Sequence, residues 1–207
     1  MTCEEHYSDY FPFFQTSIHT GLRLGELLGV KWGDVDFKSH FINVQRTYRR
    51  KSFGRPKNGK LRRVDMADEL ETTLKRLLNR RKKEALEKGK GEVEELIFHD
   101  GTDNPMEQNF IRRIFKRALK KAGLREIRLH SLRHTYASLL LSQGVSPVYV
   151  KEQMGHHSIS ITVDIYGHWI SSGHRDAVNR LSEQVSASHA QVSQRKTAQP
   201  IEITPLS

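Results

Sequence analysis

The stretch RLHSLRHTYASLLLSQG, residues 128–144, combines an amphipathic helix with basic side chains crowded into its first turn. Its apolar residues recur at the i, i+4, i+7, i+8 spacing of a helix that packs on a core, namely Leu132, Tyr136, Leu139 and Leu140. Ser131 is the predicted N-cap. Cations at a helix start are repelled by the helix dipole unless an anion binds there. His130 and Arg133 therefore indicate a site for a phosphate or a carboxylate.

The composition favours a polyanionic partner. The 207 residues include 34 Lys and Arg against 24 Asp and Glu, which gives a net charge of +10 and a pI near 9.8, so nucleic acid is the commonest candidate. The mean hydropathy is −0.63, and neither a membrane-spanning run nor a signal peptide is recognisable, which argues against a membrane partner. A single cysteine, Cys3, fits a reducing cytoplasm.

The first half of the chain is predicted to be helical with one small sheet. Thr2 and Glu5 are predicted to form a capping box for a short first helix, and Pro12 suits the first turn of a helix that stops near Gly21. Another helix follows with its apolar stripe on Leu24, Leu27, Leu28 and Trp32. FINVQRTYRR, residues 41–50, alternates like a strand, and SFGRPKNGKLRRVDM, residues 52–66, is predicted to be a hairpin turned at Asn58-Gly59.

The second half is predicted to consist of helices over 67–88, from Asn104-Pro105 through 123, from Ser146 to Gly155, and after Ser158. One of these helices carries a basic face made of Arg112, Arg113, Lys116, Arg117, Lys120 and Lys121. The fold class is therefore mainly α with a small antiparallel β-sheet (α+β). Residues 1–185 are expected to form one domain, and 186–207 a tail without its own core, either flexible or docked on a partner.

Each candidate functional residue, taken alone, has an ordinary structural interpretation. Arg23 with Glu26 at i+3 is typical of a surface salt bridge, and Lys57 is typical of an edge-strand lysine. His130 and His134 have the i, i+4 spacing of zinc ligands, but the glutamate of the HExxH motif and a cysteine cluster are both missing.

His156 follows a helix stop, where an exposed histidine is usual, and Tyr166 lies on an apolar face where a buried tyrosine is usual.

Considered together, these residues resemble the tyrosine recombinase (phage integrase) family in order and spacing. The matching stretches run from about Thr2 to His168 and are TGLRLGELLGVKWGDVDF, PKNGKLRRV, LHSLRHTYASLLL and MGHHSISITVDIYGH. The resemblance implies the catalytic-domain fold of that family and places its catalytic roles on Arg23, Lys57, His130, Arg133, His156 and Tyr166. It also implies site-specific DNA recombination on a phage or mobile element, with double-stranded DNA as substrate and a homotetramer on DNA.

The chemistry of these side chains agrees with that assignment. Arg23 and Arg133 suit a phosphodiester in its transition state, because always-protonated planar guanidinium groups grip nonbridging oxygens. A tyrosine needs help to ionise because its ordinary pKa is about 10, and His130 is the expected helper of Tyr166. The resemblance gives Lys57 the protonation of the departing sugar oxygen. The resemblance implies a 3′-phosphotyrosine ester as the product, so no ATP, metal or other cofactor is expected.

Two departures from the family pattern concern single residues, and a third concerns domain content. Ser131 stands where the family often has aspartate, and Asp65 where it often has proline. The N-terminal core-binding domain that members usually carry is expected to be absent. Two alternative functions remain open, which are strand relaxation of the type IB topoisomerase kind and DNA binding without catalysis.

Overall fold

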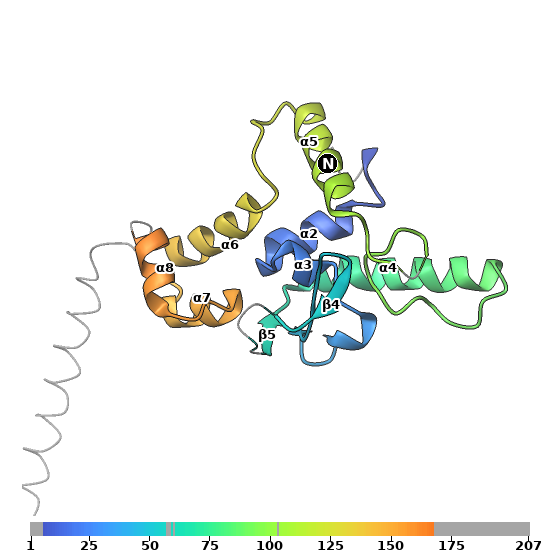
Figure 1. The fold of residues 1–207 in the computed structure, drawn as a ribbon, viewed down its shortest axis with the longest axis horizontal. Helices are drawn as coiled ribbons and strands as arrows, with labels where there is room; N and C mark the ends of the chain where they lie inside the picture. Colours follow the sequence, from blue (N-terminus) through green and yellow to red (C-terminus); the bar gives the residue numbers. More distant parts are fainter. Residues whose placement is uncertain (1–5, 57–58, 60, 103, 168–207) are drawn as a thin grey trace, which may run out of the picture. The chain divides into compact units, whose positions relative to one another are not determined.

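The computed structural model describes residues 6–56, 59, 61–102 and 104–167, all within one compact unit, Met1–Ile170. The element order in this part is helices, a group of short strands, and then further helices (Figure 1). The mainly α class with small antiparallel sheets is confirmed. The predicted boundary between 185 and 186 and the capping box of Thr2 and Glu5 lie outside the described residues.

Helix α2, Phe11–Thr20, has Pro12 in its first turn and ends at Gly21, as predicted. Gly21 has a φ of 60°, a left-handed conformation that favours glycine. A Cβ at this position would come within 2.6 Å of the Tyr136 ring. Glycine therefore ends the helix and also admits a side chain from a later helix, α6, Ser131–Ser142. The short helix α3, Leu24–Leu27, follows directly.

The strands form two separate sheets. Strands β1 (Val35–Asp36), β2 (Phe41–Val44) and β5 (Arg62–Asp65) make an antiparallel sheet in the order β1-β2-β5, which the 3-10 turn η1, Trp32–Asp34, precedes. Within the described ranges, strands β3 (Thr47–Arg49) and β4 (Ser52–Gly54) pair with each other as a two-stranded sheet.

The predicted hairpin through Asn58-Gly59 is wrong. Gly59 does lie in a turn, with its N–H donating to the Pro56 carbonyl at 2.7 Å. However, β4 on one side pairs with β3, and β5 on the other side pairs with β2. The reason is burial, since Val64 is fully buried opposite Ile42 whereas every residue of β4 is exposed. The actual hairpin turns at Arg50 and Lys51, with φ of 51° and 61°.

The remaining helices are α4 (Asp68–Glu87), α5 (Gln108–Lys121), α6 (Ser131–Ser142), α7 (Pro147–Met154) and α8 (Ile159–Tyr166). The caps at Ser146 and Ser158 are confirmed. The predicted start of α5 at Asn104-Pro105 is wrong, because the Glu107 carboxylate accepts from two backbone N–H groups and caps the helix there. Ser131 is the first residue of α6 and His130 occupies the N-cap position.

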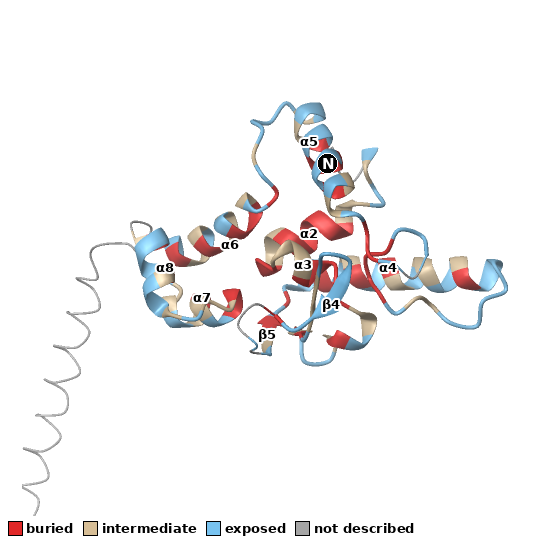
Figure 2. Cartoon of the chain, in the orientation of Figure 1, coloured by how far each residue is buried: buried red, intermediate tan, exposed pale blue. Residues whose placement is uncertain are grey.

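The buried apolar side chains of the described residues form two hydrophobic clusters. The larger cluster joins α2 and α3 to the three-stranded sheet, α4 and α5. The smaller cluster joins α6, α7 and α8 through Ala137, Leu141, Val150, Met154 and Tyr166. Leu139 was predicted to face a core, but its side chain is 52 % exposed, and Figure 2 shows α6 with only part of its surface buried.

The basic face of α5 is exposed along its whole length, as predicted, on Arg112, Arg113, Lys116, Arg117, Lys120 and Lys121. Across the described ranges, none of the helices is both long enough and apolar enough to pass through a bilayer.

Candidate active site

Arg23 and Glu26 form a buried ion pair. Helix α3 begins after Arg23, and the Glu26 carboxylate three residues later accepts from the Arg23 backbone N–H at 2.9 Å, as in a capping box. Arg23 Nη1 also lies 3.0 Å from Glu26 Oε1. Glu26 is only 1 % exposed, so the pair is not the surface salt bridge that is the ordinary interpretation of this spacing. Burial demands a charged partner for this carboxylate.

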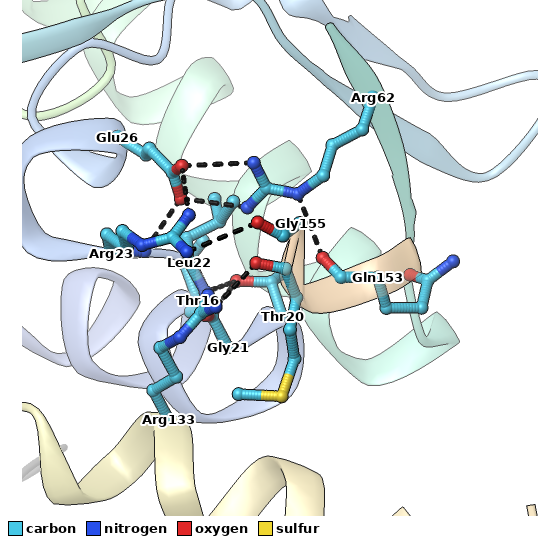
Figure 3. Close-up of polar contacts among 11 residues, drawn as sticks. Thr16, Thr20, Gly21, Leu22, Arg23, Glu26, Arg62, Arg133, Gln153 and Gly155 are labelled. Atoms are coloured by element: carbon cyan, nitrogen blue, oxygen red, sulfur yellow. Dashed lines mark hydrogen bonds and ion pairs between the residues drawn. The ribbon is translucent and has the colours of Figure 1, made fainter. Parts of the chain in front are cut away.

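A second arginine, Arg62 of β5, completes the neutralisation of Glu26. Its two terminal nitrogens donate to the two carboxylate oxygens at 3.0 and 2.8 Å (Figure 3). Burial alone raises the pKa of Glu26, but the hydrogen bonds and charges of Arg62 and Arg23 outweigh it and lower the pKa to about 2. The planar fork of Arg62 thereby fixes β5 against α3.

Arg133 of α6 is 3 % exposed and reaches from its helix toward the ends of two others. Its Nη1 donates to the Gly21 carbonyl after α2, and its Nη2 donates to the Met154 carbonyl at the end of α7. Burial and the charge of Arg23 lower the pKa of Arg133 to about 9. The guanidinium group is therefore still protonated at neutral pH.

The backbone carbonyl groups at the C-terminal end of α7 accept hydrogen bonds from Arg23, Arg62 and Arg133. Arg23 donates to the Gly155 carbonyl at 3.2 Å, and Arg62 Nε donates to the Gln153 carbonyl at 2.9 Å. Gly155 has a φ of 61°, and a Cβ there would lie 2.9 Å from Arg62 Nη1. The end of this helix thus aligns three guanidinium groups with carbonyl dipoles of the opposite sign (Figure 3).

Asp65 also contacts this end of α7. Its backbone N–H donates to Gln153 Oε1 at 2.9 Å, a bond that proline at this position would lack. Its carboxylate accepts from the Tyr149 hydroxyl. The aspartate found where the family often has proline therefore adds contacts between β5 and α7.

His156 follows Gly155 and is half-buried. Its Nδ1 lies 3.0 Å from Thr162 Oγ1 of α8. Burial, together with the positive charges of Arg133, Arg23 and Arg62, lowers its pKa to about 4. At neutral pH this histidine is consequently uncharged, and a neutral imidazole still carries one N–H for donation to an oxygen.

Tyr166 is the last residue of α8, and its side chain is 4 % exposed. Its hydroxyl oxygen lies 2.6 Å from Nδ1 of His134, not of His130, the helper expected from sequence. His130 packs edge-on against the His134 ring with centroids 4.9 Å apart. Burial raises the pKa of the Tyr166 hydroxyl, and the charge of Arg133 opposes that rise.

Two pockets adjoin these residues. One, of about 510 Å³, is lined by Arg23, Arg62 and His156 and also by Pro56 and Leu61. Lys57 itself lies outside the described residues, although Pro56 and Leu61 belong to the same connection. The other pocket, of about 820 Å³, is lined by residues of α5, of the connection that follows it and of the start of α6, including Arg112, Lys116, Arg128, His130 and Arg133.

The structure therefore brings Arg23, Arg133 and His156 to one place, and it places Tyr166 beside the same turn of α6 through His134. Sequence reasoning missed Arg62 and the contact of His134. A signal for Arg62 existed, because it is two residues from Val64 and alternate residues of a strand share a face. Its neighbour Arg63 points away and is exposed.

In the part of the chain that the structure describes, one group of three side chains has the geometry of a metal site. The ligand atoms of His40, Asp68 and Glu71 lie within 4.8 Å of one another. The group shares no residue with the arginine cluster, and Lys75 Nζ already lies 2.5 Å from Glu71 Oε1. That DNA chemistry at the arginine cluster needs no metal or cofactor stays a prediction.

The described fold resembles solved catalytic domains of DNA recombinases. The catalytic domain of bacteriophage HP1 integrase superposes with a TM-score of 0.58 at 21 % identity, covering 86 % of each chain. The Tn1549 transposon integrase, solved in complex with circular intermediate DNA, gives 0.67 at 23 % identity over 87 % of this chain and 61 % of that one. The arrangement of helices and strands is thus that of a tyrosine recombinase catalytic domain.

The sequence comparison gives the family. The profile of the phage integrase family matches residues 3–171, so the chain belongs to the phage integrase family. A "Tyrosine recombinase XerC-like" protein of Caldanaerobacter subterraneus subsp. tengcongensis is 33 % identical over 189 residues, which covers 82 % of this chain and 48 % of that protein. The chain spans about half the length of the curated relatives it matches.

Proposed function

We propose that this chain is the catalytic domain of a site-specific DNA recombinase that cuts and rejoins DNA through a 3′-phosphotyrosine intermediate. The observation that carries the proposal is the position of α6. One turn of this helix sends Arg133 into the arginine cluster and holds the Tyr166 hydroxyl through His134. Two adjacent residues of α6 therefore provide a phosphate-binding guanidinium group and a hydrogen-bond partner for the nucleophile.

In this proposal, Arg23 and Arg133 hold the nonbridging oxygens of the scissile phosphate and gain strength as charge develops there. His156 donates a hydrogen bond from its neutral ring to the same phosphate. Tyr166 is the nucleophile, His130 contacts the phosphate region from the start of α6, and Lys57 protonates the departing 5′ oxygen. Arginines and imidazoles supply the stabilisation, so the mechanism is proposed to run without metal or cofactor.

Double-stranded DNA is the proposed substrate and partner. The exposed basic face of α5 supports this, because Arg112 and Lys116 also line the pocket that contains His130 and Arg133. DNA phosphates that contact this face and the start of α6 would release their condensed counterions, and this release favours binding. The reaction is proposed to take place in the cytoplasm.

We further propose a homotetramer on DNA. Support comes from α8, whose apolar side chains Ile159, Val163 and Ile165 are 41 %, 41 % and 46 % exposed. Exposed apolar side chains clustered on one short helix favour a protein contact. Chemical crosslinking with and without DNA measures the assembly, and a chain that stays monomeric on DNA at every protein concentration would contradict it.

The test of the catalytic proposal is trapping on a nicked duplex followed by a denaturing gel. The wild-type chain is expected to form a covalent protein–DNA adduct, and Tyr166→Phe is expected to bind DNA without forming one. Tyr149→Phe, which also removes one hydroxyl, is the matched control and should keep the adduct. The reaction should persist in excess EDTA. An adduct retained by Tyr166→Phe would refute the assignment of the nucleophile, and absence of any adduct would favour a non-catalytic DNA-binding module.

A topoisomerase would also form the adduct. Exchange of strands between two differently labelled duplexes separates the two activities, because strand relaxation alone transfers no label.

A further inference from the structure

We propose that His134 accepts the proton of the Tyr166 hydroxyl when this tyrosine attacks the DNA phosphate. This inference rests on the proposed function, because it concerns the same nucleophile. Its starting point is the 2.6 Å distance between Tyr166 Oη and His134 Nδ1, which places a base directly on the reacting oxygen. Sequence reasoning had assigned that task to His130.

The packing around Tyr166 fixes the direction of its hydroxyl. Its ring belongs to the small cluster that contains Ala137 of α6 and Met154 of α7, and its hydroxyl lies at His134 in the first turn of α6. The His134 ring lies 5.7 Å from the tyrosine ring, centre to centre. Because the His134 residue is exposed, a proton that it takes up can exchange with water.

Arg133 and His134 are adjacent in sequence and divide two tasks between them. The Arg133 side chain is buried and donates to carbonyl groups after α2 and α7, where the other arginines gather. The next residue in the helix turns about 100° away, and its ring meets the tyrosine. A rigid helix thus sets the position of the base relative to the phosphate-binding guanidinium group.

His130 has a different position in this arrangement. Its ring packs at 89° against the His134 ring, and the His134 ring in turn contacts the Tyr166 ring. Among the ring contacts of the described residues, His134 therefore lies between His130 and Tyr166. His130 therefore supports the orientation of His134 from the preceding turn and remains available to a phosphate that enters the pocket beside Arg133.

The proton balance of the step is complete. The Nδ1 lone pair of His134 takes the phenolic proton while the tyrosine oxygen forms a bond to phosphorus. The bond from phosphorus to the 5′ oxygen breaks, and that oxygen receives a proton from the general acid, for which Lys57 is proposed. In rejoining, a 5′ hydroxyl attacks phosphorus and returns its proton to Lys57, while His134 returns its proton to the departing tyrosine oxygen.

The experiment measures the rate of adduct formation on the nicked duplex, using the full chain with and without added imidazole. We expect His134→Ala to slow the reaction by about 10²-fold or more, the usual contribution of a general base. Imidazole should restore part of the rate in proportion to its concentration. His157→Ala, which removes another exposed histidine, is the matched control and should react at the wild-type rate without responding to imidazole.

His134→Gln guards against a folding defect, because it keeps a polar side chain but provides no base, and it should be as slow as the alanine variant. Wild-type rates in both His134 variants would overturn the inference, as would a slow His134→Ala that imidazole does not accelerate. Rescue of His130→Ala in place of His134→Ala would assign the base to His130. If the wild-type chain forms no adduct, the proposed function itself fails. If the wild-type chain forms the adduct and only the His134 results are negative, the inference fails while the proposed function stands.

Discussion

Glu26 of α3 and Arg62 of β5 are joined by two hydrogen bonds of 3.0 and 2.8 Å although 36 residues separate them in sequence. The Glu26 carboxylate is buried, and its other cationic partner is Arg23, a proposed phosphate ligand. Arg62 thus neutralises the charge that would otherwise draw Arg23 more strongly to Glu26. This pair connects the strand that follows the Lys57 segment to the helix that positions Arg23.

Arg62→Ala should be strongly destabilising. Removing one partner of a buried ion pair leaves a buried charge and typically costs about 3–5 kcal/mol. Urea unfolding at pH 7 measures the loss. Arg63→Ala is the matched control, because Arg63 is the next residue of β5, is exposed and lies over the Phe41 ring at 4.5 Å. Equal losses in the two variants would contradict a central role for Arg62.

The lowered pKa of Glu26 predicts a loss of stability in acid. The pKa falls from 4.5 to about 2 on folding, so the carboxylate stabilises the folded state above pH 4.5 and this contribution disappears as the pH falls toward 2. At about 1.4 kcal/mol for each pH unit, it amounts to about 3 kcal/mol. Urea unfolding at pH 5 and pH 3 should show a smaller difference in Glu26→Gln than in wild type. An unchanged difference would show that Glu26 does not control this part of the pH dependence.

His156 should titrate near pH 4 in the free protein. Because its pKa is lowered from 6.5, the unfolded chain binds a proton more readily, and the free energy of unfolding should fall as the pH drops from 6.5 toward 4. NMR titration of the histidine ring signals, assigned with His156→Gln, measures the pKa. A phosphate bound among Arg23, Arg62 and Arg133 would offset their charge and raise that pKa. Titration of His156 near 6.5 in the free protein would contradict its burial beside the three arginines.

Arg23→Ala and Arg133→Ala should each slow adduct formation by about 10²-fold or more, the loss expected when a donor to the transition state is removed. Noncovalent DNA affinity should decrease much less. The comparison requires both a binding isotherm and a single-turnover rate for each variant, with Arg125→Ala, an exposed arginine in the connection after α5, as control. Equal losses in affinity and rate would mean that these arginines only hold DNA.

DNA binding by the 207-residue chain should be weak, strongly dependent on salt and poor in sequence preference, because phosphate contacts dominate and release counterions. Replacing Arg113 and Arg117 by alanine on the basic face of α5 should flatten the slope of log K against log salt by about 2, since each phosphate contact contributes roughly 1. Filter binding or fluorescence anisotropy across a salt series measures the slope. Efficient recombination of two target sites by this chain alone at physiological salt would contradict this expectation.

The sequence by itself determined the local elements and the family. Helix ends followed from Pro12 and Gly21 and from Ser146 and Gly155, because these residues act through their own backbone geometry. The order and spacing of the sequence stretches that contain the arginines, histidines and tyrosine indicated the phage integrase family. The profile match over residues 3–171 confirms this prediction. The helical spacing of its charged and apolar residues predicted the basic face of α5.

Tertiary structure decided which partners those residues have. The strands beside Gly59 pair with β2 and β3 instead of with each other, because Val64 is buried opposite Ile42 whereas every residue of β4 stays exposed. Glu26 and Arg62 are 36 residues apart, so the strand alternation that places Arg62 on the face of Val64 does not by itself identify Glu26 as its partner. The same holds for His134, whose contact with Tyr166 spans 32 residues and depends on how α6 and α8 pack. Long-range contacts of this kind arise from burial of whole elements, which short sequence motifs do not encode.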